Sequence, residues 1–203
     1  MDSLTQLTEL LKKLPGIGPR QSRRLAFWFV RQDVAFIQSF SKTLLEARST
    51  ITVCPKCKRL HPKNSAREQC AICSSEARDA TTVMLVEKDV DLENIERTGT
   101  YTGRYFVLGG TTSPLDAHPE KKVRIESFLA LLANTNEPIR EIIIALSATT
   151  EGEDTYTYIE EKIKPFIESR GIVITKLGRG LSTGTELEYV DKDTMVHALK
   201  RRS

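Results

Sequence analysis

The residues with the most specific spacing are four cysteines in the pattern C-x2-C-x12-C-x2-C: Cys54, Cys57, Cys70 and Cys73. Two such pairs bring four thiolates to the corners of a tetrahedron, the coordination that structural zinc prefers. Four thiolates leave no open position for water, so the pattern predicts one structural zinc ion per chain and no catalysis there. Two disulfides and a redox-active pair are the alternatives; a cytosolic chain disfavours the first, and the second leaves one pair unexplained. His61 lies in the spacer and is expected at the surface.

A second group of residues is acidic. The apolar run 142–146 is followed by Glu151, Glu153 and Asp154, and Glu87 ends the apolar run VMLVE. In parallel sheets, sites form at the carboxyl ends of strands, where these carboxylates can converge. Oxygen ligands of this kind hold divalent cations such as Mg²⁺. Two interpretations stay open: a metal site, and acidic side chains that stabilise the N-terminus of the following helix.

The third group is basic and surrounds the stretch PGIGPR, residues 15–20. An amphipathic helix ends at the first proline of this stretch, and a second helix is predicted to start at Pro19. The N-terminus of that helix offers unpaired N–H groups that suit a phosphate, and glycines allow the backbone to come close. The residues expected to contact a nucleic-acid backbone, without reading its sequence, are Gly16, Gly18, Arg20, Arg23 and Arg24. The alternative is a plain corner between helices whose glycines only permit packing.

The charge of the chain is unevenly distributed along its 203 residues. Residues 1–79 contain 14 Lys and Arg against 7 Asp and Glu, whereas residues 80–203 contain 16 against 20. A basic N-terminal part favours contact with a polyanion there; a solvated basic face is the alternative. No apolar stretch approaches the roughly 20 residues of a membrane helix, and no apolar signal region opens the chain. We therefore expect a cytoplasmic protein without membrane contact.

Beyond residue 80, apolar runs alternate with helical patterns. Strands are predicted at 83–87, 104–110, 141–147 and 171–178, and helices at 90–98, 124–135 and 154–170. This alternation predicts a parallel sheet with helices on both faces. The chain has no phosphate-binding loop of the form G-x-x-x-x-G-K-[ST], so ATP binding is not expected. The segment LEYVD at 187–191 is therefore interpreted as an edge strand or a loop.

Five motifs occur in one order along the chain: LPGIGPRQSRRLAF, the double CxxC, RYFVLGGTTSPLD, TTEGED and TGTELEYVD. Together they closely resemble the RecR family of bacterial recombination mediators, over essentially the whole chain. The resemblance implies an α/β multi-domain fold. Its parts are a helix-hairpin-helix DNA-binding region (1–52), a four-cysteine zinc module (53–79), a topoisomerase–primase (Toprim) parallel α/β domain (80–177) and a Walker B-like swapped tail (178–203).

The resemblance also implies partners. Family members form dimers and tetrameric rings wide enough for DNA, and with RecO and RecF they load the strand-exchange recombinase onto gapped DNA coated with single-strand-binding protein. By analogy, Arg20 and Arg24 match basic positions that contact DNA. Glu87 and Glu151, with Glu153 beside them, match acidic Toprim positions on a face that contacts RecO. The loop SPLDAHPEKKVR is more basic than the glycine-rich loop of the family, so the analogy does not extend to it.

The acidic region departs from a catalytic Toprim site, in which D-x-D precedes E-G-E. Here Glu151-Gly152-Glu153 is retained, but Ser147 and Thr149 replace both aspartates. Neutral hydroxyls are weak substitutes for carboxylates around Mg²⁺. We therefore expect a non-enzymatic DNA clamp in which any Mg²⁺ between Glu87 and Glu151 binds weakly. The alternative is a metal-dependent nuclease or nicking–closing enzyme that uses Glu87, Glu151 and Glu153.

Overall fold

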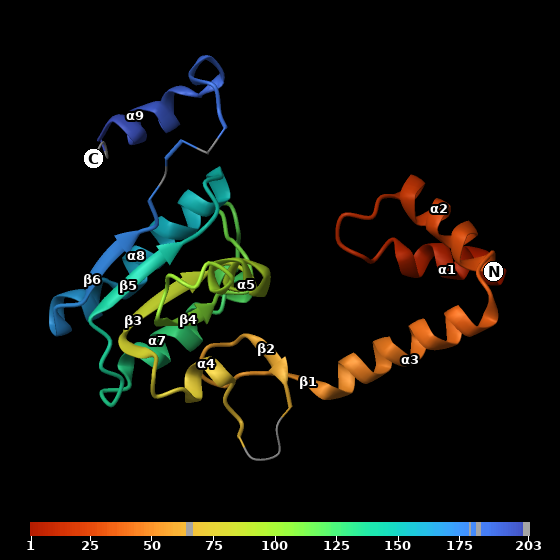
Figure 1. The fold of residues 1–203 in the computed structure, drawn as a ribbon, viewed down its shortest axis with the longest axis horizontal. Coiled ribbons are helices and arrows are strands. Elements are labelled where there is room, and N and C mark those ends of the chain that lie inside the picture. Colours follow the sequence, from red (N-terminus) through yellow and green to blue (C-terminus); the bar gives the residue numbers. More distant parts are fainter. Residues whose placement is uncertain (64–66, 179, 182–183, 201–203) are drawn as a thin grey trace. The chain divides into compact units, whose positions relative to one another are not determined.

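A computed structural model describes residues 1–63, 67–178, 180–181 and 184–200 of the chain (Figure 1). The chain divides into two compact units, Met1–Thr52 and Val53–Ser203. The first coincides with the expected helix-hairpin-helix region. The second contains both the cysteine pairs and the α/β segment, and its further division into a module, a domain and a tail remains a prediction.

Three helices make up the first unit: α1 (Ser3–Leu11), α2 (Pro19–Val30) and α3 (Val34–Thr50). Each begins at a residue suited to a helix N-terminus. The carboxylate of Asp2 accepts a hydrogen bond from the Thr5 N–H, Pro19 is the first residue of α2, and Asp33 accepts from the Phe36 N–H. Helix α1 packs against α2, so the predicted pair of helices is confirmed.

A four-stranded parallel sheet forms the centre of the second unit, with the strand order β4-β3-β5-β6 (Figure 1). Its strands are β3 (Asp79–Val86), β4 (Gly103–Val107), β5 (Glu141–Ala145) and β6 (Val173–Lys176). The register places Val86 beside both Val107 and Ala145. The segments that follow β3, β4 and β5 therefore leave the sheet at the same edge. The parallel sheet predicted from the alternating pattern is confirmed.

Alternate strand residues enter two separate buried layers, because successive side chains of a strand point to opposite faces. Helices α7 (Ile125–Ala133) and α8 (Thr150–Arg170) cover the layer that contains Leu85, Phe106 and Ile144. The other layer contains Met84, Tyr105, Ala145, Leu92 of α5 (Asp89–Glu96) and all four cysteines. The cysteine segment is thus part of the core on the second face of the sheet.

Most predicted element ends shift by one to four residues, and two differences bear on the acidic region and on the tail. Helix α8 begins at Thr150 instead of residue 154, because the Thr149 side chain accepts a hydrogen bond from the Gly152 N–H and caps the helix. In the tail, a short 3₁₀ helix, η1 (Leu187–Tyr189), stands where an edge strand or a loop was expected, and α9 (Lys192–Lys200) follows it. Within the described parts of the chain, no helix has both the length and the apolar character to cross a membrane.

Candidate functional site

The four cysteines converge in one buried cluster. Their Sγ atoms all lie within 4.8 Å of one another, and the Sγ atoms of Cys57 and Cys70 are 3.5 Å apart. Tetrahedral bonds of about 2.3 Å to a central ion place sulfur atoms about 3.8 Å apart, so the cluster has the size that one ion requires. None of the four side chains is more than 4% exposed. The geometry is that of a closed site without room for a reacting water.

Two short turns aim the thiols at one point. One runs from β1 (Ile51–Val53) to β2 (Leu60–Pro62), which pair with each other, and the other leads into α4 (Ala71–Ser74). In the first turn Lys58 has a φ of 63°, the only positive value for a non-glycine among the described residues. Such a conformation costs a residue with a side chain about 1–2 kcal/mol, so the surroundings must impose it. It lets the Lys58 N–H donate to the Cys54 carbonyl and the Cys54 N–H to the Arg59 carbonyl.

The thiols also control one another's ionisation. Hydrogen bonding with Cys57 lowers the pKa of Cys54, whereas hydrogen bonding with Cys54 raises the pKa of the Cys73 thiol. Thiolates this close repel one another unless a cation balances their charge. Among the described residues, these four cysteines are the only group of three or more His, Cys, Asp or Glu side chains close enough to hold an ion. The donor set fits a structural metal that prefers sulfur.

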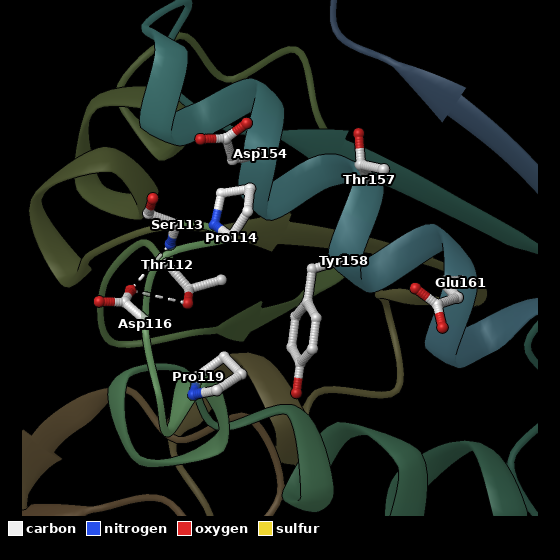
Figure 2. Close-up of a pocket in the computed structure, with 9 residues that line it drawn as sticks. All are labelled: Thr112, Ser113, Pro114, Asp116, Pro119, Asp154, Thr157, Tyr158 and Glu161. Atoms are coloured by element: carbon white, nitrogen blue, oxygen red, sulfur yellow. Dashed lines mark hydrogen bonds between the residues drawn. The ribbon is translucent and has the colours of Figure 1, made fainter.

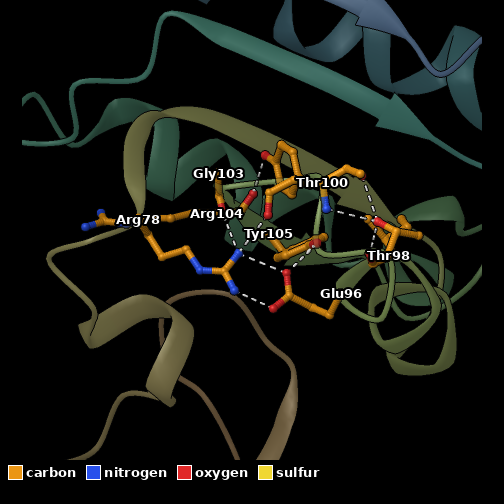
Figure 3. A network of polar contacts seen from close by, with 9 residues as sticks. Arg78, Glu96, Thr98, Thr100, Gly103, Arg104 and Tyr105 are labelled. Carbon is orange, nitrogen blue, oxygen red and sulfur yellow. Dashed lines mark hydrogen bonds and ion pairs between the residues drawn. The ribbon is translucent and has the colours of Figure 1, made fainter.

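Hydrogen bonds join the cysteine segment to the sheet. The Val107 N–H donates to the Cys57 carbonyl at 2.8 Å, and the Leu60 N–H donates to Asp89 Oδ1 at 2.7 Å. Just after the last cysteine, the Arg78 guanidinium pairs with Glu96 at the end of α5 and donates to backbone carbonyls near the start of β4 (Figure 3). The metal centre therefore supports the second face of the sheet.

The expected surface position of His61 is wrong. This side chain is 7% exposed, and its Nε2 atom has no hydrogen-bond partner in the described part of the chain. The reason is strand alternation: His61 lies in the middle of β2, where Leu60 and Pro62 point outward and the residue between them points inward.

The acidic pocket forms where the chain leaves β3 and β5. Glu87 directly follows β3, and its side chain is 8% exposed. It accepts a hydrogen bond from Ser147 Oγ at 3.0 Å and forms an ion pair with Lys88 Nζ at 2.5 Å. The ends of β3 and β5 thus lie side by side, and Ser147, not a second carboxylate, contacts Glu87 there. Ser147 occupies the first aspartate position of D-x-D. Its hydroxyl donates its hydrogen bond to Glu87, one of the carboxylates expected to bind Mg²⁺.

The remaining carboxylates have different surroundings. Glu151 lies exposed in the first turn of α8, and Glu153 forms an ion pair of 3.2 Å with Lys176. As far as the structure describes the chain, no three of these acids lie close enough together to share one ion. The hydroxyl of Thr149, at the second aspartate position, caps α8 instead.

Three residues of this region escaped the sequence prediction: Lys88, Gly152 and Lys176. Lys88 was visible as the neighbour of Glu87, and Lys176 lies near the end of the predicted strand 171–178. For Gly152, the sequence gives no sign of a structural role except its position in the motif E-G-E. A Cβ atom there would lie 1.9 Å from the Ser147 carbonyl oxygen, so only glycine lets α8 start this close to the end of β5.

The turn between α1 and α2 presents its basic residues to solvent. Gly16 has a φ of 76°, and Gly18 is the N-cap of α2 and offers no side chain to bind the first N–H groups. Those groups remain available to an anion. Arg20, Arg23 and Arg24 are all exposed, and within the described chain no carboxylate pairs with any of them. The structure brings together the five residues that the sequence singled out here.

Comparisons with known proteins identify the family of the chain. Residues 4–48 match the family described as RecR, helix-hairpin-helix; residues 81–177 match the Toprim domain; and residues 180–203 match RecR, C-terminal. The recombination protein RecR of Lactobacillus acidophilus is 38% identical over 200 residues, which cover 98% of this chain and 96% of that protein. Recombination protein RecR of Pelodictyon phaeoclathratiforme is 35% identical over 202 residues, which cover 99% of this chain and 96% of that protein.

The relative from Streptococcus mutans, also named recombination protein RecR, is 36% identical over 200 residues. These residues cover 98% of this chain and 96% of that protein. The similarity thus extends through the helix-hairpin-helix unit, the cysteine pairs, the Toprim domain and the tail. This chain belongs to the RecR family.

Proposed function

We propose that this protein is a sequence-nonspecific DNA-binding mediator of recombinational DNA repair, and that it acts as a clamp and adaptor without catalysis. Its relatives are named recombination proteins. The proposed partners are single- and double-stranded DNA, RecO and RecF, and further copies of the chain, from a homodimer to a homotetrameric ring in the cytoplasm. In this role it helps to load the strand-exchange recombinase onto gapped DNA coated with single-strand-binding protein.

The observation that carries the DNA-binding proposal is the turn before α2. Its arginines are exposed and without carboxylate partners among the described residues, and Gly18 leaves the N-terminus of α2 without a side-chain cap. A phosphate accepts hydrogen bonds from such a helix end, and arginines one turn along reach the next phosphates. Contacts of this kind bind the backbone of any sequence.

The acidic pocket supports an adaptor better than an enzyme. A catalytic Mg²⁺ site needs several oxygen ligands around one ion. Here Ser147 and Lys88 contact the Glu87 carboxylate, Lys176 contacts Glu153, and Glu151 is exposed. We propose instead that Glu87, Glu151 and Glu153 belong to the surface that binds RecO, and that Mg²⁺ binds there weakly if at all.

The metal proposed for the cysteine cluster is zinc, one ion per chain. Zinc accepts four thiolates in a tetrahedron and has no redox chemistry, as a closed structural site requires. Metal analysis of the purified protein should give close to one zinc per chain. A folded protein that contains no metal would contradict this assignment.

The DNA-binding proposal is tested by the double substitution Arg20→Ala/Arg24→Ala. Loss of two phosphate contacts should weaken binding to duplex DNA of any sequence. It should also lower the slope of log affinity against log salt by about 2, close to 0.9 for each contact. Binding is measured by fluorescence anisotropy over a range of salt concentrations.

The matched control is Arg48→Ala/Arg140→Ala, which removes the same charge from exposed positions outside the turn. It should leave the salt slope nearly unchanged. If both double variants weaken binding equally, the turn is not the DNA contact. In the same preparations, Mg²⁺-dependent cleavage of plasmid that Glu151→Gln abolishes would show that the protein is a Toprim enzyme after all.

A further inference from the structure

A pocket of about 310 Å³ lies between α8 and the loop that follows β4 (Figure 2). Neither the cysteines nor Glu87, Glu151 and Glu153 line it. Its helix wall contains Asp154, Tyr158 and Glu161. The opposite wall contains Ser113, Pro114 and Pro119, the last being the first residue of α6 (Pro119–Lys122). The pocket therefore combines apolar ring surfaces with three carboxylates, those of Asp116, Asp154 and Glu161.

Hydrogen bonds hold the loop wall against α8. The buried Thr155 hydroxyl accepts from the Thr112 N–H at 2.8 Å, and its single proton is shared between the Glu151 carbonyl at 2.6 Å and the Thr112 carbonyl at 3.1 Å. Asp116 closes the loop by accepting from Thr112 Oγ1 at 3.0 Å and from the Ser113 N–H at 2.8 Å. The cavity is thus formed before any ligand arrives, which lowers the entropy that binding must overcome.

The charges around the pocket are negative and partly uncompensated. Asp116 pairs with Lys122, but no hydrogen bond or ion pair engages the side chains of Asp154 and Glu161 within the described chain. Burial, together with the charges of Glu120, Glu126 and Glu161, raises the pKa of the Tyr158 hydroxyl. Lys162 Nζ lies 5.6 Å from the centre of the Tyr158 ring, close to the limit of about 6 Å for a cation–π contact. The pocket repels phosphate and attracts cations.

The spacing of the carboxylates selects the shape of a ligand. Asp154 and Glu161 are seven residues apart on α8, which corresponds to about 10.5 Å along the helix axis. One guanidinium cannot contact both. In a polyproline II segment, residues i and i+3 lie on the same side and are about 9.3 Å apart. Aromatic and proline surfaces are also what such segments bind.

We propose that this pocket docks an extended segment of a partner protein that carries arginines at positions i and i+3. One guanidinium pairs with Asp154 near Pro114, and the other pairs with Glu161 and lies along the Tyr158 ring. Arginine suits these positions better than lysine, because its planar guanidinium both stacks on rings and pairs with carboxylates. The docking site goes beyond the proposed DNA-binding role and uses none of the arginines that support it.

The test measures saturation-transfer NMR signals of the peptide acetyl-Arg-Pro-Pro-Arg-amide in the presence of the full chain at low salt. The arginine side chains should receive saturation. Acetyl-Arg-Arg-Pro-Pro-amide, with the same composition, should bind several-fold more weakly. The variant Asp154→Asn/Glu161→Gln should raise the Kd for the first peptide about tenfold, since two partly exposed pairs contribute about 1.4 kcal/mol together.

The matched control is Glu76→Gln/Glu168→Gln, which changes the net charge equally at exposed positions outside the pocket. It should leave the Kd within about twofold. Equal Kd values for both peptides, equal effects of the two double variants, or self-association of the chain that only the pocket variant abolishes would each overturn the proposal. DNA affinity measured on the same variants should stay unchanged, so failure here is distinct from failure of the DNA-binding role.

Discussion

The cysteine cluster lies against the second face of the central sheet, and the acidic pocket lies where the chain leaves β3 and β5. Both contain residue types that bind metals. They differ in the partners that the protein supplies. The thiols of Cys54, Cys57, Cys70 and Cys73 contact one another, within the residues that the structure describes. The carboxylates of Glu87 and Glu153 instead contact a hydroxyl and two lysines.

This difference supports a metal in one region more than in the other. Thiolates packed together repel one another unless a cation balances their charge, so the proposed metal would stabilise the fold of the cysteine segment. In the acidic pocket, Lys88 and Lys176 supply positive charge and Ser147 supplies a hydrogen bond. Protein groups there balance part of the negative charge of the carboxylates.

The largest effect should come from breaking the cysteine cluster. Cys70→Ser removes one thiolate ligand and weakens a site whose metal binding contributes about 10–16 kcal/mol in small zinc domains. The cysteines share a core with Met84 and Tyr105, so the loss should spread to the sheet. We expect a variant that is unfolded or melts tens of degrees lower, measured by circular dichroism and by zinc content.

Ser75→Ala is the control, because this neighbouring residue contributes no ligand; it should retain the metal and the melting temperature. A strong chelator should destabilise the parent protein and leave Cys70→Ser unchanged. If Cys70→Ser melts together with the parent, the cluster is not a structural support.

The next largest effect should come from Gly152→Ala, which tests whether the acidic pocket is a packed structural region. The added Cβ would lie 1.9 Å from the Ser147 carbonyl oxygen, so either α8 or the end of β5 must shift. Overpacking of this kind costs about 3 kcal/mol or more. Urea denaturation gives the loss in free energy of unfolding. Gly180→Ala, where no atom of the described residues lies within 4 Å of the new Cβ, should change it by less than about 0.5 kcal/mol.

The same two regions show what the sequence can and cannot predict. The metal ligands were predictable, because two C-x2-C turns bring each pair of thiols together through local geometry. The partners of the acids were not, because Ser147 and Glu87 are 60 residues apart and meet only through the register of β3 and β5. The alternation of strands and helices predicted the parallel sheet, but not that the cysteine segment packs on its second face.

Three features of the structure were missed in the sequence prediction, each for a reason that concerns one segment of the chain. The start of α8 was missed because Thr149 was considered as a replaced metal ligand and not as a helix cap. The burial of His61 was missed because a three-residue strand is too short for a pattern of alternation to be recognised. The pocket beside Tyr158 has no sequence signal, since its walls come from a loop and a helix that are some 40 residues apart.

A smaller effect should follow from restoring the lost acids with Ser147→Asp/Thr149→Asp. Without metal, the new carboxylate beside buried Glu87 should cost about 2 kcal/mol of stability, because like charges repel and a hydrogen bond is lost. Mg²⁺ should reverse this loss: a ligand at 100 times its Kd stabilises by about 2.7 kcal/mol. Thermal melting with and without Mg²⁺ measures both effects.

The parent protein and Ser147→Asn/Thr149→Asn, which adds polar side chains without charge, should show no such gain in melting temperature. An equal gain for all three would mean that Mg²⁺ acts elsewhere on the protein.

The smallest effect should come from Glu96, a carboxylate that is paired with the guanidinium of Arg78. Glu96 accepts a hydrogen bond of 2.9 Å from Arg78 and one of 2.7 Å from the Tyr105 hydroxyl (Figure 3). The Arg78 hydrogen bond lowers the pKa of Glu96 below its usual value. A lowered pKa stabilises the folded protein above the unfolded-state value of about 4.3, and this contribution disappears as the pH falls through the folded-state pKa. Glu96→Gln should therefore cost about 1.5 kcal/mol at pH 7, as loss of a charge-assisted bond does.

That cost should shrink as the pH falls below about 4.3, so the urea midpoints of Glu96→Gln and the parent protein should approach each other in acid. Glu93→Gln, an exposed position on the same helix, should follow the parent at every pH. Parallel curves for Glu96→Gln and the parent would show that the Arg78–Glu96 pair adds no pH-dependent stability. The junction between the cysteine segment and the sheet would then depend on the metal and on backbone hydrogen bonds such as that from the Val107 N–H to the Cys57 carbonyl.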